Sequence, residues 1–216
     1  MSSIAITGGA TGTGVFSLLA PSTSTDRTLT LPDSTGTILS TASTAVVTPA
    51  MLTQPLTSGT AVASTSGTSI DFTSIPSWVK RITVMLNTVS TNGGSALLIQ
   101  IGSSGGIETT GYDSIATTTT TTNNTTRGAG STSGYLLSGS PNGAAATPSG
   151  AITLVNISSN SWLVSGSIAD SNAIGPGVSV VGGTKSLSGT LTQVRITTVN
   201  GTDAFDAGSI NILYEG

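Results

Sequence analysis

The sequence is a succession of short apolar segments, rich in valine, isoleucine and threonine, separated by clusters of glycine, serine and asparagine. No stretch keeps the periodicity of an amphipathic helix over several turns. Segments of this length and spacing are typical of antiparallel strands that pack in two layers. We therefore predict an all-β fold, with a jelly-roll-like β-sandwich head over residues 60–216. Its expected strands lie near residues 69–72, 75–86, 97–102, 134–137, 151–157, 161–168, 178–181, 191–199 and 209–214.

The spacing of apolar residues within these segments predicts how their faces are used. Segment 191–199 alternates apolar with polar side chains, as expected of a strand with one dry and one wet face. In segment 75–86 the alternation shifts, which predicts a β-bulge. Trp78 and Trp162 stand at strand entries, and we expect them to be anchors in the core or at its rim.

Two stretches of low complexity interrupt the expected strands. Residues 117–133 hold a run of threonine and asparagine followed by glycine and serine, and residues 138–150 are rich in glycine, proline and alanine. Such composition predicts loops, which we place at an exposed end of the head. Because threonine also favours pleated backbone, a threonine strand on an outer face is the alternative for the first stretch.

Residues 1–44 contain only two or three short apolar segments between turns. They cannot enclose a core by themselves, because even a complete isolated hairpin is at best marginally stable in water. We predict an extended N-terminal β arm whose apolar side chains are covered by other chains. The side chains expected at this contact with other chains are Val15, Phe16, Leu18, Leu29 and Leu31.

Residues 45–59 are predicted to join the arm to the head. Thr48 is a suitable N-cap, and Pro49 occupies the first helical position, where its missing N–H costs nothing. Pro55 then ends any helix. The segment predicts a single helical turn over residues 50–54.

Ionisable side chains are scarce, and this excludes several classes of function. The 216 residues include 6 lysines and arginines and 9 aspartates and glutamates, with no histidine and no cysteine. A nucleic-acid partner is not expected, because no basic surface is available for phosphates. The missing histidine and cysteine remove the commonest general base and several metal sites. We see neither a basic leader nor a long apolar run, so no signal peptide and no membrane insertion are predicted.

Three patterns could carry chemistry, but each fits a structural role better. Residues 8–14 are glycine-rich yet lack the Gly-Lys-Ser/Thr ending of a phosphate-binding loop. Residues 200–206 resemble a calcium loop only loosely, and their opening Asn-Gly is a strong hairpin signal. The carboxylates stand mostly in turn-like contexts, which disfavours the paired acids of a glycosidase. We predict no catalytic residue, no cofactor and no metal site.

Several phrases of the sequence resemble those of bacteriophage tail-fibre and other virion-surface proteins. They are TLTLPDSTGTIL at 28–39, VVTPAML at 46–52, DFTSIPSWVKRITV at 71–84 and TNGGS at 91–95. The resemblance implies a homotrimer in which the arm anchors to the particle and the β head is distal. It also implies partners among other virion proteins of the tail or the major capsid. The expected location is the surface of the phage particle, after synthesis in the host cytoplasm.

The predicted function is therefore that of a virion structural protein, a trimeric fibre or knob whose head attaches to a glycan or receptor of the host surface. Because the arm is short, a capsid decoration (cement) protein at capsomer junctions is the alternative. A surface-polysaccharide depolymerase ranks third. The candidate distal contacts, which flank or belong to the threonine-rich stretch, are Tyr112, Arg127 and Tyr135.

Overall fold

The computed structural model describes residues 24, 54–122, 124–140, 143–172 and 175–216. The chain divides into the units Met1–Val46 and Val47–Gly216, and every described residue except Ser24 belongs to the second. The predicted arm and its five contact residues lie outside the described residues, as does the predicted helical turn apart from Gln54. These features stay predictions.

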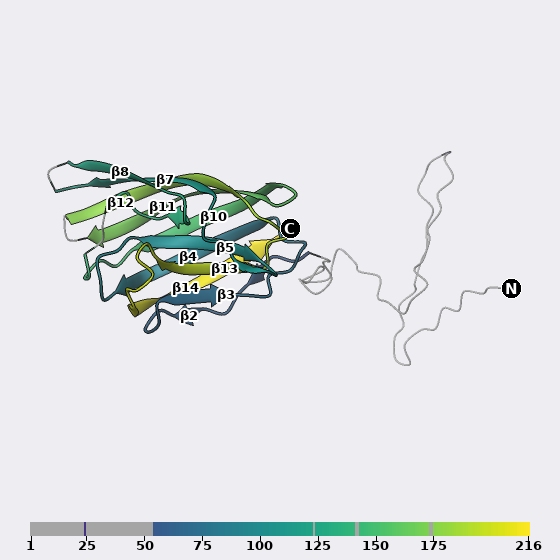
Figure 1. Ribbon diagram of the computed structural model, residues 1–216, viewed down its shortest axis with the longest axis horizontal. Coiled ribbons are helices and arrows are strands. Elements are labelled where there is room, and N and C mark those ends of the chain that lie inside the picture. Colours follow the sequence, from purple (N-terminus) through teal and green to yellow (C-terminus); the bar gives the residue numbers. More distant parts are fainter. Residues whose placement is uncertain (1–23, 25–53, 123, 141–142, 173–174) are drawn as a thin grey trace. The chain divides into compact units, whose positions relative to one another are not determined.

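The larger of two antiparallel sheets has nine strands (Figure 1). Their order across the sheet is β1-β14-β4-β10-β11-β12-β7-β8, and β2 also pairs with β14. β10, β11 and β12 are consecutive in the chain and form a meander of long strands. The strands are β1 (Thr57–Ser58), β2 (Val62–Ala63), β4 (Arg81–Thr91), β7 (Tyr112–Thr120), β8 (Thr126–Ser131), β10 (Ser149–Ser158), β11 (Ser161–Asn172), β12 (Gly175–Ser186) and β14 (Phe205–Glu215).

The smaller sheet has five strands in the order β3-β13-β5-β6, with β9 also paired to β5. In Figure 1 its strands run across the part of the head that holds β4 and β14, whereas β7 and β8 lie along the opposite border. The strands are β3 (Ser69–Phe72), β5 (Leu97–Ser103), β6 (Gly106–Ile107), β9 (Tyr135–Leu136) and β13 (Gln193–Thr198).

The hydrophobic core is the layer of side chains between the two sheets. The alternation of each strand sends one set of side chains into this layer, where they form a single buried cluster. The predicted all-β sandwich is confirmed for the described residues, which contain no helix. Its unequal sheets and its three-strand meander differ from the two Greek keys of an eight-stranded jelly roll. The cluster includes Ile82, Val84, Ile152 and Leu154 of the large sheet and Ile99, Ile101, Val194 and Ile196 of the small sheet.

The irregular segment near residue 80 is a strand entry and not the bulge that we predicted. Val79 is buried in the turn that precedes β4, and the regular alternation begins at Arg81. The register of β4 with β14 shifts further along, where Gly208 has a φ of 93°. A Cβ there would lie 2.3 Å from the carbonyl oxygen of Thr88, so only glycine fits this bulge. As predicted, Trp162 is buried and Trp78 packs against the core from its rim.

The threonine-rich stretch forms the end of β7 and the strand β8, so the predicted loop at 117–133 is wrong outside the connection between Thr120 and Thr126, and the alternative of a threonine strand holds there. Alternate side chains of β7 point inward, and Thr118 is fully buried there. Its Oγ1 shares hydrogen bonds of 2.7 Å with Ser179 Oγ and 3.1 Å with Ser138 Oγ, and it accepts one of 2.9 Å from the Gly139 N–H. Threonine can therefore occupy this interior because every hydroxyl of the group has a partner.

Replacing Thr118 with alanine should destabilise the head by about 1–3 kcal/mol, because Ser179 and the Gly139 N–H lose their buried partner. Thr119→Ala is the matched control: it removes the same hydroxyl and the same β-branched shape from an exposed neighbour, and should cost within about 0.5 kcal/mol. Urea unfolding followed by tryptophan fluorescence measures both. Equal losses in the two variants would show that the buried hydroxyl group adds nothing to stability.

Candidate functional site

The side of the large sheet that faces away from the small sheet is a continuous surface, which we call the outer face. Cross-strand pairing fixes its rows of side chains. One row runs Gly130, Ile115, Gly182, Ser165, Thr153, and the next runs Gly128, Thr117, Val180, Ser167, Ala151. The face thus extends over β8, β7, β12, β11 and β10.

Apolar side chains protrude from the outer face. Ile115 is 60% exposed and Val180 is 61% exposed, and Val178, Leu163, Val155 and Ile157 are also exposed on the same strands. Ile115 pairs with Gly130 and Gly182 and Val180 pairs with Thr117 and Ser167, whereas Val155 pairs with Leu163 and Arg81. A contiguous exposed apolar surface of this kind marks an interaction site more often than chance.

The alternation of β12 is inverted relative to that of an ordinary half-covered strand. Val178 and Val180 point outward, while Ser179 between them is 1% exposed. β7 resembles it in part, with Ile115 outside and the hydroxyls of Ser114 and Thr118 inside, although Tyr112 and Ala116 of β7 and Val181 of β12 are buried as in an ordinary strand. A sheet with one wet face normally places its apolar residues on the other face. The exposed apolar side chains make this part of the outer face a candidate contact surface.

Charge is confined to the ends of the outer face. Among the described outward-facing residues of β7, β8, β10, β11 and β12, only Asp113 is ionisable. The row that contains it ends on β4 and β14, where Arg81 and Glu215 form an exposed ion pair of 3.0 Å. Exposed strands of soluble proteins usually carry lysine and glutamate, so the hydroxyl-rich centre of this face is unusual.

Of the three predicted distal contact residues, only Arg127 is exposed. Tyr112 and Tyr135 are 3% and 0% exposed, so the expectation that they form an exposed contact is wrong. Their rings meet edge to face with centroids 5.0 Å apart, and the Tyr135 hydroxyl donates to the Trp162 carbonyl. Burial raises the pKa of both phenols. Exposure was expected because both tyrosines flank the polar threonine-rich stretch, but alternate side chains of that stretch are themselves buried.

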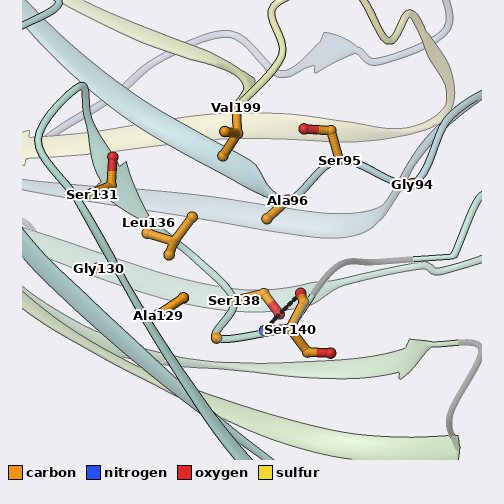
Figure 2. A pocket seen from close by; sticks show the side chains of 11 residues that line it. Gly94, Ser95, Ala96, Ala129, Gly130, Ser131, Leu136, Ser138, Ser140 and Val199 are labelled. Carbon is orange, nitrogen blue, oxygen red and sulfur yellow. Dashed lines mark hydrogen bonds between the residues drawn. The ribbon is translucent and has the colours of Figure 1, made fainter.

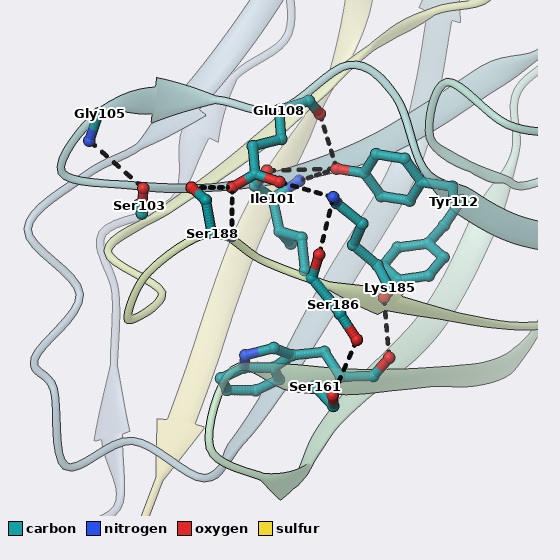
Figure 3. Close-up of polar contacts among 11 residues, drawn as sticks. Ile101, Ser103, Gly105, Glu108, Tyr112, Ser161, Lys185, Ser186 and Ser188 are labelled. Atoms are coloured by element: carbon teal, nitrogen blue, oxygen red, sulfur yellow. Dashed lines mark hydrogen bonds and ion pairs between the residues drawn. The ribbon is translucent and has the colours of Figure 1, made fainter.

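Glu108 and Lys185 form the one ion pair among the described residues in which the cation is buried (Figure 3). Lys185 Nζ lies 2.6 Å from Glu108 Oε2 and 5.4 Å from the centroid of the Tyr112 ring. The other carboxylate oxygen accepts hydrogen bonds from the N–H and the hydroxyl of Ser188. Burial alone would raise the pKa of Glu108, but the hydrogen bonds from Lys185 and Ser188 outweigh it and lower that pKa. All charged groups of this cluster are mutually satisfied, so it is a structural clamp.

A cavity of about 300 Å³ opens beside β8, where the small sheet does not reach (Figure 2). Ala96, Leu136 and Val199 face Ala129 across it, and serine residues complete the wall. No ionisable side chain lines the cavity. It could receive an apolar side chain, but it offers no group that could activate a bond.

The loop at residues 200–206 is a hydrogen-bonded turn. Asn200 Oδ1 accepts from the N–H groups of Thr202 and Asp203, and Asp203 Oδ2 accepts from the Ser95 N–H. The carboxylate and amide oxygens are thus used to close the turn, as the Asn-Gly signal predicted. No group of three or more potential metal ligands occurs among the residues that the structure describes.

Comparisons with known proteins add no assignment: no family model matches the chain, and neither a curated protein nor a solved structure is significantly similar to it. The fold and the site define an all-β sandwich with a wide uncharged face. Within the described part of the chain, no helix is long and apolar enough to cross a bilayer.

Replacing Glu108 with glutamine should destabilise the head by about 1–3 kcal/mol at pH 7, because charge-assisted hydrogen bonds are lost. The lowered pKa means that the wild type holds this stabilisation above the ordinary carboxyl value of 4.5 and loses it as the pH falls below that value. The difference in unfolding free energy between the wild type and Glu108→Gln should therefore shrink as the pH falls from about 5 to about 3, a range that brackets this value. Thermal unfolding across this range checks the prediction, with the exposed Asp113→Asn as control. A deficit independent of pH would contradict it.

Proposed function

We propose that the protein is a bacteriophage virion structural protein, a homotrimeric fibre or knob that anchors through its N-terminal arm and presents the β head for attachment to the host surface. The outer face is the observation that carries the proposal. Its centre is uncharged and combines the exposed Ile115 and Val180 with small and hydroxyl-bearing side chains, which suits a surface covered by protein. The phrases at 28–39 and 71–84 that resemble virion appendage proteins support the same assignment.

The composition of the outer face favours copies of the same chain as the covering partner. In a homotrimer three copies of one face converge on the three-fold axis, where like charges would oppose each other and disfavour the contact. The centre of this face has no such charges, because Asp113 and the Arg81–Glu215 pair stand at its limits. Large side chains such as Val180 also alternate with glycine, as at Gly182, so one copy presents both protrusions and depressions to its neighbour.

Val180→Glu should weaken assembly of the full chain by about 100-fold or more, because like charges and buried carboxylates cost several kcal/mol at a symmetric contact. Light scattering with size-exclusion chromatography measures the mass as a function of concentration. Val180→Thr, which keeps the branched shape without charge, should retain the trimer. So should Ser66→Glu, which adds the same charge in an exposed turn. A monomeric wild type would contradict the proposal.

Because the chain has no cysteine, a thiol placed on the outer face reports directly on its coverage. The thiol of Val180→Cys should react slowly with a maleimide in the assembled protein and quickly after dissociation in urea. The thiol of Ser66→Cys should react quickly in both states. Equal reactivity of the two thiols in the trimer would show that the outer face is open, and that the arm alone holds the copies together.

Location and copy number separate the two structural roles. Antibodies against the purified head should label intact particles at the tail if the protein is a fibre, and quantitative mass spectrometry should find few copies for each particle. Labelling over the whole capsid with a copy at every capsomer junction would assign the decoration role instead. Absence from particles would contradict both.

A further inference from the structure

The outward side of the small sheet carries a second concave surface, distinct from the cavity beside β8. It is a basin of about 290 Å³, which is near the lower limit of small-molecule sites. Gln100 of β5 and Arg195 and Thr197 of β13 lie along it. Thr109 and the turn at Asn200 contribute to its rim. We call it the small-sheet basin.

The only charged group in the lining of the basin is already neutralised. Arg195 Nε and Nη2 donate to the two carboxylate oxygens of Asp71, each at 2.7 Å. The two side chains are 34% and 35% exposed, so the pair remains within reach of a ligand. The Nη1 of Arg195 has no acceptor among the described residues. A planar ion pair of this kind offers donors and acceptors side by side without net charge.

The remaining polar groups are held in fixed orientations. Gln100 Nε2 donates to the Ser133 carbonyl at 2.8 Å, which leaves its Oε1 as an acceptor. Thr197 Oγ1 donates to the Thr68 carbonyl at 2.8 Å, which leaves the oxygen lone pairs free to accept. Val199, about half exposed, adds an apolar surface next to these groups. Such preorganisation reduces the entropy that binding would otherwise cost.

We propose that the small-sheet basin binds the terminal unit of a neutral saccharide. Adjacent hydroxyls of a sugar donate and accept at once, so they match the free donor Nη1 of Arg195 and the acceptor oxygens of Gln100 and Thr197, while Asp71 beside the basin holds Arg195 in place. The C–H face of the ring matches Val199. An anionic ligand is not favoured, because the one cation of the basin is already paired with Asp71. A purely apolar ligand is not favoured either, because it would remove water from the fixed polar groups without replacing their hydrogen bonds. The volume suits one sugar unit and not a long buried chain.

This inference deepens the proposed function, on which it rests for the source of the saccharide, the host surface. Binding itself can be measured without a virion. The probes are glucose, galactose, mannose and N-acetylglucosamine, with N-acetylneuraminic acid as an anionic comparison. Saturation-transfer NMR and titration calorimetry on the full chain should detect binding of at least one of the four neutral sugars.

The double variant Arg195→Gln with Asp71→Asn should weaken that binding at least about 10-fold, since a pair of directional hydrogen bonds is lost. The matched control is Arg81→Gln with Glu215→Gln, which removes the other exposed arginine–carboxylate pair and should leave sugar affinity unchanged. In the wild type, amide shifts on sugar addition should centre on Gln100 and Arg195. This mapping keeps the test decisive even if the double variant fails to fold.

Three results would overturn the inference: no binding of any neutral sugar, unchanged affinity in the folded double variant, or shifts that centre on Ala129 and Leu136 beside β8. Binding of the anionic sugar alone would also overturn it. Failure of the basin is distinguishable from failure of the proposed function. If the protein is a trimer and antibodies find it on particles, but it binds no neutral sugar, only the inference about the basin fails. Conversely, Val180→Glu should disrupt assembly while the basin of each copy still binds sugar.

Discussion

The stacking of a five-stranded sheet on a nine-stranded one is the interaction on which the rest of the head depends. It buries Ile99 and Ile196 of the small sheet together with Ile82 and Ile152 of the large sheet in one cluster. Because the small sheet is narrower, the strands β7, β8 and β12 are covered by only its two-residue strand β9. Their inner side must then be closed by something else, and this requirement explains both the hydroxyl group around Thr118 and the cavity beside β8.

The same mismatch explains why polarity is inverted on β7 and β12. Inside, Thr118 and Ser179 satisfy each other and the covering loop, so hydroxyls replace hydrocarbon at modest cost. On the outer side, Ile115 and Val180 are surrounded by small, uncharged side chains, so no strongly hydrated group lies beside them. A strand built this way gains little from burying its inner face alone. It gains more when a partner removes its outer face from water, at roughly 25 cal/mol for each Å² of apolar surface.

Much of the fold could be predicted from the sequence, because segments such as 151–157 and 161–168 have the length and composition of long central strands. The errors share one physical cause: serine and threonine do not reveal which face they occupy. The run at 117–122 has no apolar residue to mark an inner side, so hydrogen bonding with Ser138 and Ser179, far along the chain, decides its orientation. The burial of Tyr112 follows from the same pairing, since β7 carries it under the small sheet beside Tyr135.

The candidate sites were less accessible to sequence reasoning, since each depends on the register of distant strands. Asp71 meets Arg195 only because β3 pairs with β13, and Glu108 meets Lys185 only because the loop after β6 lies against the end of β12. A signal for the outer face did exist in Val178-Ser-Val180, whose valines are spaced for one face while serine takes the other. Assigning those valines to the core follows the ordinary rule for half-buried strands. That rule assumes a solitary domain, and the exposed Ile115 of β7 and Val178 and Val180 of β12 support the proposal that this domain works in an assembly.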